Sequence, residues 1–182
     1  MLYYCGMRYI VLLRGINISG RNKVSMEKLR NILSHEGYQD VKSYLNSGNI
    51  ILSSDDEKKE IYKSIRRVLK ENFDLDIEVM IIDKETLCAI MKHAPKWWND
   101  GKDKYHNLIF ILNGYNTEAI YEEIGMADND IDQVMIYDNV IFWSFDLKRY
   151  QKSLWWKKTA SKGLTEKLTI RNANTLLKII EM

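Results

Sequence analysis

The sequence has little of what a disulfide-stabilised or membrane-spanning protein needs. Its 182 residues include two cysteines, Cys5 and Cys88, and a single proline, Pro95. Two cysteines cannot form a disulfide framework, and such low usage is typical of a reducing compartment. No apolar run approaches the roughly 20 residues that cross a bilayer. Residues 1–6 lack the basic and apolar regions of a signal peptide. We therefore expect a cytoplasmic protein with no membrane partner. Because Met7 directly precedes the first predicted strand, we interpret residues 1–6 as an upstream start or a cloning remnant.

The chain also lacks a recognisable catalytic or metal-binding cluster. Its three histidines, His35, His93 and His106, are scattered, and Cys88 with His93 has no second ligand pair nearby. No serine stands in the pattern of a nucleophile elbow. The sequence therefore predicts no metal and no cofactor, and it identifies no catalytic residue.

Charge of one sign is missing from one segment and nearly missing from another, although the net charge is only +2. Residues 113–146 hold eight acids and no Lys or Arg, and residues 147–171 hold eight bases and one acid, Glu166. Such asymmetry can mark a surface that binds polyanions, or two neighbouring solvated faces. The small net charge favours the second interpretation.

The apolar fraction of 46% is enough for a packed core. In the first half, apolar spacing predicts strands at 9–13, 41–45, 50–52 and 77–82. A helix is expected from Ser25 to Gly37, and a longer one after a capping box formed by Ser54 and Glu57. Asp83 is expected to cap a third helix.

The second half repeats this order. Strands are predicted at 108–112, 133–137, 140–145 and 168–170, with helices at 117–124 and 153–162 and a terminal helix capped by Asn172. Both halves are therefore predicted to be ferredoxin-like βαββαβ repeats, each an antiparallel sheet with helices packed on one face, in an α+β fold. We expect repeat 1 with its trailing helix at 7–93, a linker with Pro95 and Trp97-Trp98 at 94–105, and repeat 2 at 106–182.

The topology of such a repeat brings two polar motifs together. Right-handed crossovers give the strand order 4-1-3-2, in which the first two strands run in the same direction. The loop after the first strand and the hairpin between the second and third must then emerge at one edge of the sheet. We therefore expect Gly15 to lie near Asn49.

The loop from Arg14 to Lys23 is the first of these motifs. It offers backbone amides through Gly15 and Gly20, carries basic side chains, and precedes a helix N-terminus. These features suit a phosphate or a carboxylate. The alternative is structural: the glycines permit left-handed turns, while Asn17 and Asn22 satisfy the loop backbone.

The second motif, Ser47-Gly48-Asn49, is either hairpin chemistry or a polar rim beside the basic loop. Arg171 follows the last strand and could complete an anion site or pair with an acid. The candidate ligand-binding residues are Arg14, Gly15, Asn17, Gly20, Asn22, Lys23, Ser47, Asn49 and Arg171.

Paired tryptophans and phenylalanines raise the question of nucleic-acid recognition. Neighbouring helical residues point about 100° apart, so Trp155 and Trp156 cannot share one buried face. We expect one in the core and the other partly exposed, available to a partner or a base. Recognition of RNA on the second sheet, through Phe110, Phe142 and Phe145, is disfavoured because the longer RRM signature is missing.

Three motifs resemble those of one bacterial family, the domain of unknown function 1697. They are Leu12-Leu13-Arg14-Gly15-Ile16-Asn17 with Gly20 and Asn22-Lys23, then Ser47-Gly48-Asn49, then Thr169, Arg171-Asn172 and Thr175. The resemblance extends from about Met7 to the C-terminus and implies a ferredoxin-like α+β fold in a cytoplasmic bacterial protein. It implies no activity, cofactor or catalytic residue. Ala173, where the family favours tryptophan, and Leu52, where it favours phenylalanine, depart from the pattern.

These observations favour a binding module for an anionic ligand, either a small molecule such as a nucleotide or a nucleic acid. An enzyme that uses the same cleft is one alternative, with cationic stabilisation of a developing anion. A protein–protein adaptor is the other, using the basic block and an exposed tryptophan. The sequence does not decide whether the chain forms a homo-oligomer.

Overall fold

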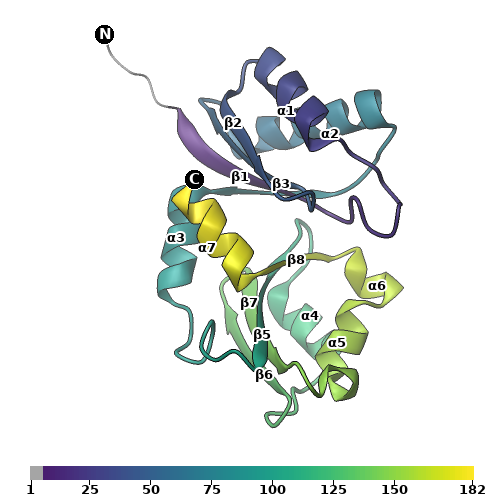
Figure 1. The fold of residues 1–182 in the computed structure, drawn as a ribbon, viewed down its shortest axis with the longest axis vertical. Coiled ribbons are helices and arrows are strands. Elements are labelled where there is room, and N and C mark those ends of the chain that lie inside the picture. Colours follow the sequence, from purple (N-terminus) through teal and green to yellow (C-terminus); the bar gives the residue numbers. More distant parts are fainter. Residues whose placement is uncertain (1–5) are drawn as a thin grey trace. The chain divides into compact units, whose positions relative to one another are not determined.

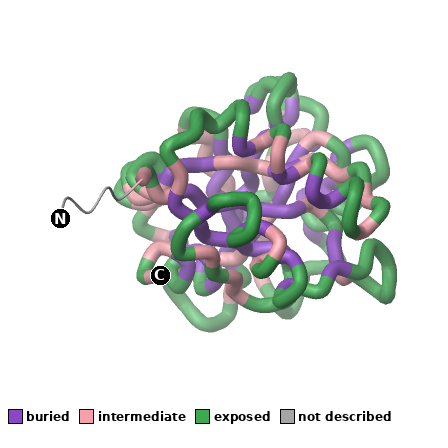
Figure 2. Tube along the Cα trace, turned by 90° about the horizontal axis from the view of Figure 1, so that it is seen from above, coloured by how far each residue is buried: buried purple, intermediate pink, exposed green. Residues whose placement is uncertain are grey.

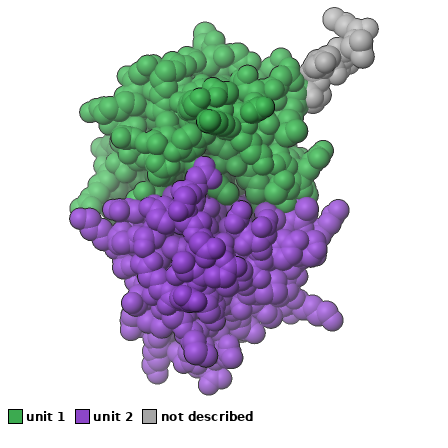
Figure 3. Space-filling view, turned by 180° about the vertical axis from the view of Figure 1, so that it is seen from behind, with its two compact units in different colours: residues 1–88, 178–182 green, residues 89–177 purple. Residues whose placement is uncertain are grey.

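The computed structural model describes residues 6–182. The interpretation of residues 1–6 as an upstream start or a cloning remnant concerns mainly residues 1–5, which lie outside the described residues. The chain divides into two compact units, residues 1–88 with 178–182 (unit 1) and residues 89–177 (unit 2) (Figure 3). Both divisions fall within helices, α3 (Lys84–Lys92) and α7 (Ala173–Glu181). The longest buried stretches are residues 9–13, 48–53, 106–112 and 140–145, and exposed stretches separate them along the chain (Figure 2).

Unit 1 contains a four-stranded antiparallel sheet. Its strands are β1 (Met7–Leu13), β2 (Gln39–Tyr44), β3 (Asn49–Ser54) and β4 (Val79–Asp83), in the order β2-β3-β1-β4. Figure 1 labels the first three of these strands. Helix α1 (Met26–His35) connects β1 to β2, and α2 (Lys58–Phe73) connects β3 to β4. This is the predicted order, so the prediction of a split βαβ topology is confirmed for the first repeat.

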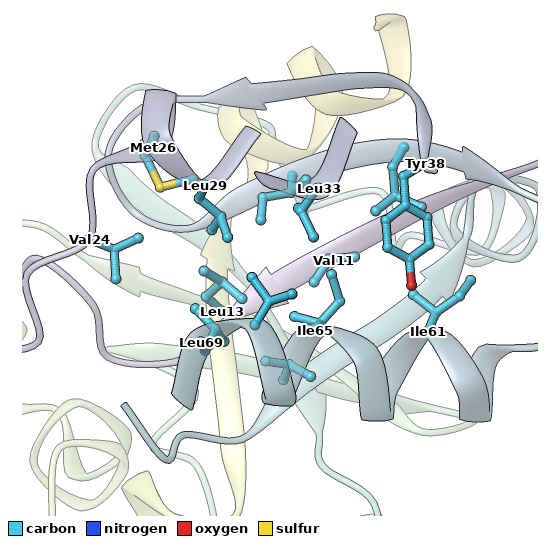
Figure 4. Close-up of a cluster of buried hydrophobic side chains, with 14 of the residues drawn as sticks. Val11, Leu13, Val24, Met26, Leu29, Leu33, Tyr38, Ile61, Ile65 and Leu69 are labelled. Carbon is cyan, nitrogen blue, oxygen red and sulfur yellow. The ribbon is translucent and has the colours of Figure 1, made fainter. Parts of the chain in front are cut away.

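The core of unit 1 lies between this sheet and helices α1 and α2. Alternate residues of β1, Val11 and Leu13, point to the same face, where they join Leu29 of α1 and Ile65 and Leu69 of α2 (Figure 4). All five are fully buried. The helical spacing of the apolar residues thus places one face of each helix on the sheet.

The start of α2 differs from the prediction. Ser54 is the last residue of β3, paired with Met7, and its Oγ accepts a hydrogen bond from the Asp56 amide at 3.1 Å. Helix α2 begins at Lys58, and its N-cap residue, Glu57, makes no side-chain capping bond. The expected Ser54–Glu57 capping box is therefore wrong, because β3 extends two residues further than its apolar run. The cap of α3 is as expected, since Asp83 Oδ1 accepts from the Thr86 amide at 2.7 Å.

Unit 2 has the same strand order. Its strands are β5 (Lys104–Ile111), β6 (Asp132–Tyr137), β7 (Val140–Asp146) and β8 (Leu168–Asn172), arranged antiparallel as β6-β7-β5-β8. Helix α4 (Thr117–Ile124) connects β5 to β6, as predicted. A 3₁₀ turn, η1 (Tyr150–Lys152), and two short helices, α5 (Leu154–Thr159) and α6 (Lys162–Thr165), connect β7 to β8. The fold is therefore α+β with two ferredoxin-like units.

The single helix predicted at 153–162 is wrong. Ser161 has extended backbone angles, φ −71° and ψ 148°, which separate α5 from α6. In addition, the Thr159 hydroxyl donates to the Trp155 carbonyl at 2.7 Å, an interaction that weakens helix continuation. Two short helices result where apolar spacing alone indicated one.

The core of unit 2 confirms the prediction for the second tryptophan pair. Trp155 is fully buried against Trp143, whereas Trp156 is 41% exposed. On the opposite face of the sheet, Trp98 packs edge-on against Phe142 and donates from Nε1 to the Asn107 carbonyl at 2.7 Å. The segment expected to be a linker thus contributes a side chain to the packing of unit 2.

Candidate anion-binding site

The loop between β1 and α1 is folded by its own polar groups. The Asn17 amide donates to the Asn22 carbonyl at 3.1 Å, and the Arg21 amide to the Ile18 carbonyl at 2.9 Å. Asn17, Ser19 and Asn22 have φ values of 53°, 48° and 47°. Asparagine tolerates this left-handed region better than most residues. Polar residues at these positions therefore suit the turns of the loop.

The side chains of Asn17 and Asn22 are used within unit 1. Asn17 Oδ1 accepts from the Val24 amide at 2.9 Å, while its Nδ2 donates to the carbonyls of Val24 at 3.0 Å and Asn46 at 2.8 Å. Asn22 Nδ2 donates to the Gly15 carbonyl at 2.9 Å. These contacts support the structural interpretation of both asparagines.

The loop and the β2–β3 hairpin lie side by side, as the topology predicts. Leu12 of β1 pairs with Asn49, and the Leu13 amide donates to the Gly48 carbonyl at 2.8 Å. Gly48 has a φ of 79°, and a Cβ there would lie 2.6 Å from the Leu13 Cβ. Only glycine fits where the two segments meet.

Ser47 and Asn49 hold the hairpin together. The fully buried Asn49 donates from Nδ2 to the Tyr44 carbonyl and to Ser47 Oγ, both at 3.0 Å. This gives both residues a structural role. Their part in ligand binding stays a prediction.

A hollow of about 720 Å³ opens between this loop, the start of α1 and the end of β2. It is lined by Asn17, Gly20, Lys23, Val24, Ser25, Met26, Glu27, Arg30, Ser43, Leu45 and Asn46. Three of the predicted residues, Asn17, Gly20 and Lys23, are in this wall.

Sequence reasoning missed Arg30, Ser43 and Asn46. One signal was available: Arg30 stands four residues after Met26, so it lies one turn further along the same side of α1. The contributions of Ser43 and Asn46 depend on where α1 lies relative to β2. No local pattern indicates that position.

The wall of the hollow carries basic groups that acids do not neutralise. Arg30 Nη1 donates to Ser43 Oγ at 2.6 Å. Among residues 6–182, neither Lys23 nor Arg30 forms an ion pair with an acid, and the same is true of Arg14 and Arg21 on the loop. Glu27 is the acidic residue of the lining.

The beginning of α1 forms another part of the wall. Ser25 Oγ caps the helix by accepting from the Lys28 amide at 3.2 Å. The first amides of a helix and its dipole attract negative charge. The hollow thus brings together cations, a helix start and amide side chains, which are the features that the sequence-based prediction of an anion site requires.

Arg171 belongs to unit 2, on β8. It is 8% exposed, and its Nη1 donates to Thr169 Oγ1 at 2.9 Å and to the Ile170 carbonyl at 2.8 Å. Burial lowers the pKa of Arg171 to about 10. Asn172 caps α7 as predicted, accepting from the Thr175 amide at 2.8 Å. A part for Arg171 in ligand binding stays a prediction.

Comparison with known proteins places the chain in a family. The family model described as "Protein of unknown function (DUF1697)" matches residues 7–142, and the chain belongs to this family. The chain is also similar to a solved structure titled "The structure of conserved bacterial protein SP0830 from Streptococcus pneumoniae". The two are 29% identical with a TM-score of 0.84, over 96% of this chain and 97% of that one. No curated protein matches.

The family model covers two of the three motifs that the sequence analysis identified. The basic loop and the Ser47–Asn49 turn lie within the residues that the family model matches, whereas Arg171 lies beyond them. Neither similarity names a ligand. Within residues 6–182, no helix has both the length and the apolar content to span a membrane.

Proposed function

We propose that this protein binds a small phosphate- or carboxylate-bearing ligand, such as a nucleotide, in the hollow beside the β1–α1 loop. The observation that carries the proposal is the placement of Lys23 and Arg30 in one wall with the start of α1. Neither cation has an acidic partner among residues 6–182. An anion bound there would gain both charges and the helix dipole.

Volume and rigidity also support a small ligand. About 720 Å³ is within the usual range for small-molecule sites. Asn17 ties the loop to the hairpin through the Asn46 carbonyl, so the wall is held in place before a ligand arrives. A preformed site loses less conformational freedom on binding.

A binding role is favoured over catalysis by the chemistry of the lining. Among residues 6–182, Glu27 is the one carboxylate of the lining, which includes no histidine or cysteine from that range. Acid–base catalysis requires a positioned proton donor or acceptor. We propose a cytoplasmic location as well, on the basis of the low cysteine content.

A thermal-shift and calorimetric screen tests the binding site. The probes are inorganic phosphate, pyrophosphate, nucleoside mono- and triphosphates and citrate at low ionic strength. We expect at least one to stabilise the protein and Lys23→Ala with Arg30→Met to weaken its binding roughly tenfold or more, as for two charge-assisted contacts. Lys59→Ala, an exposed change on α2, is the control. Equal binding by both variants would contradict the proposal.

A further inference from the structure

A run of four aromatic rings lies on unit 2. Tyr105 of β5 contacts Phe145 of β7 with ring centroids 5.5 Å apart, and Phe145 contacts Trp156 of α5 at 5.2 Å. Trp156 in turn meets Tyr150 of η1 edge-on at 5.3 Å. The rings therefore form one connected strip (the aromatic strip) that joins β5 to the consecutive elements β7, η1 and α5.

The strip combines one buried ring with three partly exposed rings. Phe145 is only 2% exposed, whereas Tyr105, Trp156 and Tyr150 are 39%, 41% and 37% exposed. Trp155 and Thr159 of α5 are buried, and this orientation directs Trp156 outward. Packing against Phe145 positions the rings of Tyr105 and Trp156, and Trp156 in turn contacts Tyr150.

Lysines flank the residues of the strip along the chain. Lys148, Lys152 and Lys157 stand beside its residues in the sequence, and among residues 6–182 none of them forms a side-chain hydrogen bond or ion pair. The nearby Asp146 is bound by Arg149, Nε to Oδ2 at 2.8 Å. Uncompensated lysines therefore dominate this part of the basic block.

A second hollow adjoins the strip at Tyr105. Its volume is about 370 Å³, and Lys102, Lys104, His106 and Asn172 are among its lining residues. Asn172 Nδ2 donates to the Tyr105 hydroxyl at 3.1 Å, which fixes the ring at the rim. His106 is held by Ser144 Oγ at 2.6 Å, so the hollow has an ordered polar floor.

We propose that this surface of unit 2 binds single-stranded nucleic acid. Bases would stack on Tyr105, Trp156 and Tyr150, while the phosphates follow the lysines and the second hollow. Exposed aromatic rings interleaved with cations are how sequence-tolerant single-strand sites combine stacking with backbone attraction. A folded acidic protein would use the lysines but would not need exposed aromatic rings among them.

The proposed mode differs from recognition on a sheet face. Phe110 is fully buried, and Phe142 is covered by Trp98, so neither can stack on a base. The exposed rings come instead from the start of the interior strand β5 and from the connection after β7. The proposal goes beyond the anion hollow of unit 1, since it shares none of its residues.

Binding of fluorescein-labelled oligo(dT) and oligo(rU), measured by anisotropy at low ionic strength, tests this surface. We expect Trp156→Leu to weaken binding roughly 5- to 100-fold and Trp156→Phe to retain most of it, since stacking needs a ring. Tyr115→Leu is the matched control, because Tyr115 is a 46% exposed aromatic of unit 2 outside the strip. Thermal melting of each variant checks that the fold is intact.

Four results would overturn the proposal. One is no detectable binding of either oligonucleotide. Another is an equal loss of affinity in Trp156→Leu and Tyr115→Leu. The third is equal competition by polyglutamate, which would indicate an acidic protein partner attracted by charge alone. If only Lys23→Ala with Arg30→Met abolished binding, the oligonucleotide would occupy the hollow of unit 1. In that case this proposal would be wrong while the proposed function stood.

Discussion

The side chain of Asn17 joins two motifs that are about thirty residues apart, donating from Nδ2 to the Asn46 carbonyl at 2.8 Å. The side-chain amide of Asn17 also forms hydrogen bonds with the backbone carbonyl and the backbone N–H of Val24, and these bonds close the β1–α1 loop. One side chain thus sets the shape of the loop and its distance from the hairpin. The wall of the hollow beside the β1–α1 loop depends on the shape of the loop and on its distance from the hairpin.

Replacing Asn17 should therefore be costly. Asn17→Ala removes three hydrogen bonds and places alanine at a φ of 53°. At about 1 kcal/mol for each bond and about 1 kcal/mol for the backbone strain, we expect a loss of about 4 kcal/mol in the free energy of unfolding. Asn17→Gly, which relieves the backbone strain but also loses the bonds, should recover about 1 kcal/mol. Urea denaturation measures both, and a loss below about 1 kcal/mol in Asn17→Ala would contradict this role.

Two glycines with nearly equal backbone angles should respond differently to alanine. Gly20 and Gly48 have φ values of 78° and 79°, but a Cβ meets nothing within 4 Å at Gly20 and lies 2.6 Å from the Leu13 Cβ at Gly48. Gly20→Ala should cost about 1 kcal/mol from strain alone. Gly48→Ala should cost a further 1–3 kcal/mol, roughly, through overpacking. Equal losses for the two in chemical denaturation would mean that the hairpin adjusts freely.

Because of Asp83, the free energy of unfolding should decrease at acidic pH. Burial raises the pKa of Asp83, but hydrogen bonds from Lys58 and Thr86 outweigh it and lower the pKa to about 2. The pKa of Asp83 in the folded protein therefore lies below the unfolded value of about 3.9. The ionised carboxylate stabilises the fold fully above about pH 4, and this stabilisation is lost as the pH falls towards about 2. It amounts to roughly 2 kcal/mol.

Asp83→Asn checks this dependence. We expect the difference in unfolding free energy between the wild type and this variant to shrink as the pH falls from about 5 to 2. Asp74→Asn, whose side chain is 90% exposed beside Lys70, is the control and should change little. A difference for Asp83→Asn that is constant with pH would show that the carboxylate charge is not responsible.

Trp98 should matter more than its neighbour Trp97. Trp98 is 6% exposed, packs on Phe142 and donates to the Asn107 carbonyl, whereas Trp97 is half-buried. Trp98→Ala should lower the free energy of unfolding by about 3–5 kcal/mol, and Trp97→Ala by less than half of that. Comparable losses would mean that the 94–105 segment packs through both rings.

Ligand affinity at the hollow beside the β1–α1 loop should depend on salt concentration. If Lys23 and Arg30 bind the ligand, its affinity should fall as ionic strength rises, since exposed charges are screened within about 8–10 Å. Arg30→Lys, which keeps the charge, should retain more affinity than Arg30→Met. Affinity that does not change with salt would indicate that apolar contacts dominate. Calorimetric titration at several salt concentrations makes the comparison.

Much of this fold was predictable because its signals are local. The strands, the helices α1, α2 and α4, and the caps at Ser25, Asp83 and Asn172 follow from apolar periodicity and the chemistry of neighbouring residues. The convergence of the loop and the hairpin followed from topology. Two local predictions were wrong, at Ser54 and at Ser161, where strand pairing and backbone angles overrode the helical pattern.

The sequence by itself determined the two sheets, their strand order, and the polar loop that must lie beside a polar hairpin, because periodicity and crossover handedness leave few alternatives. Only the tertiary structure decided how the side chains divide their roles. It assigned Asn17, Asn22 and Asn49 to internal hydrogen bonds, and it brought Arg30 and Ser43 to the wall of the hollow. The reason is physical: a side chain's partners depend on distances between elements that are far apart in the sequence, and no spacing along the chain encodes those distances.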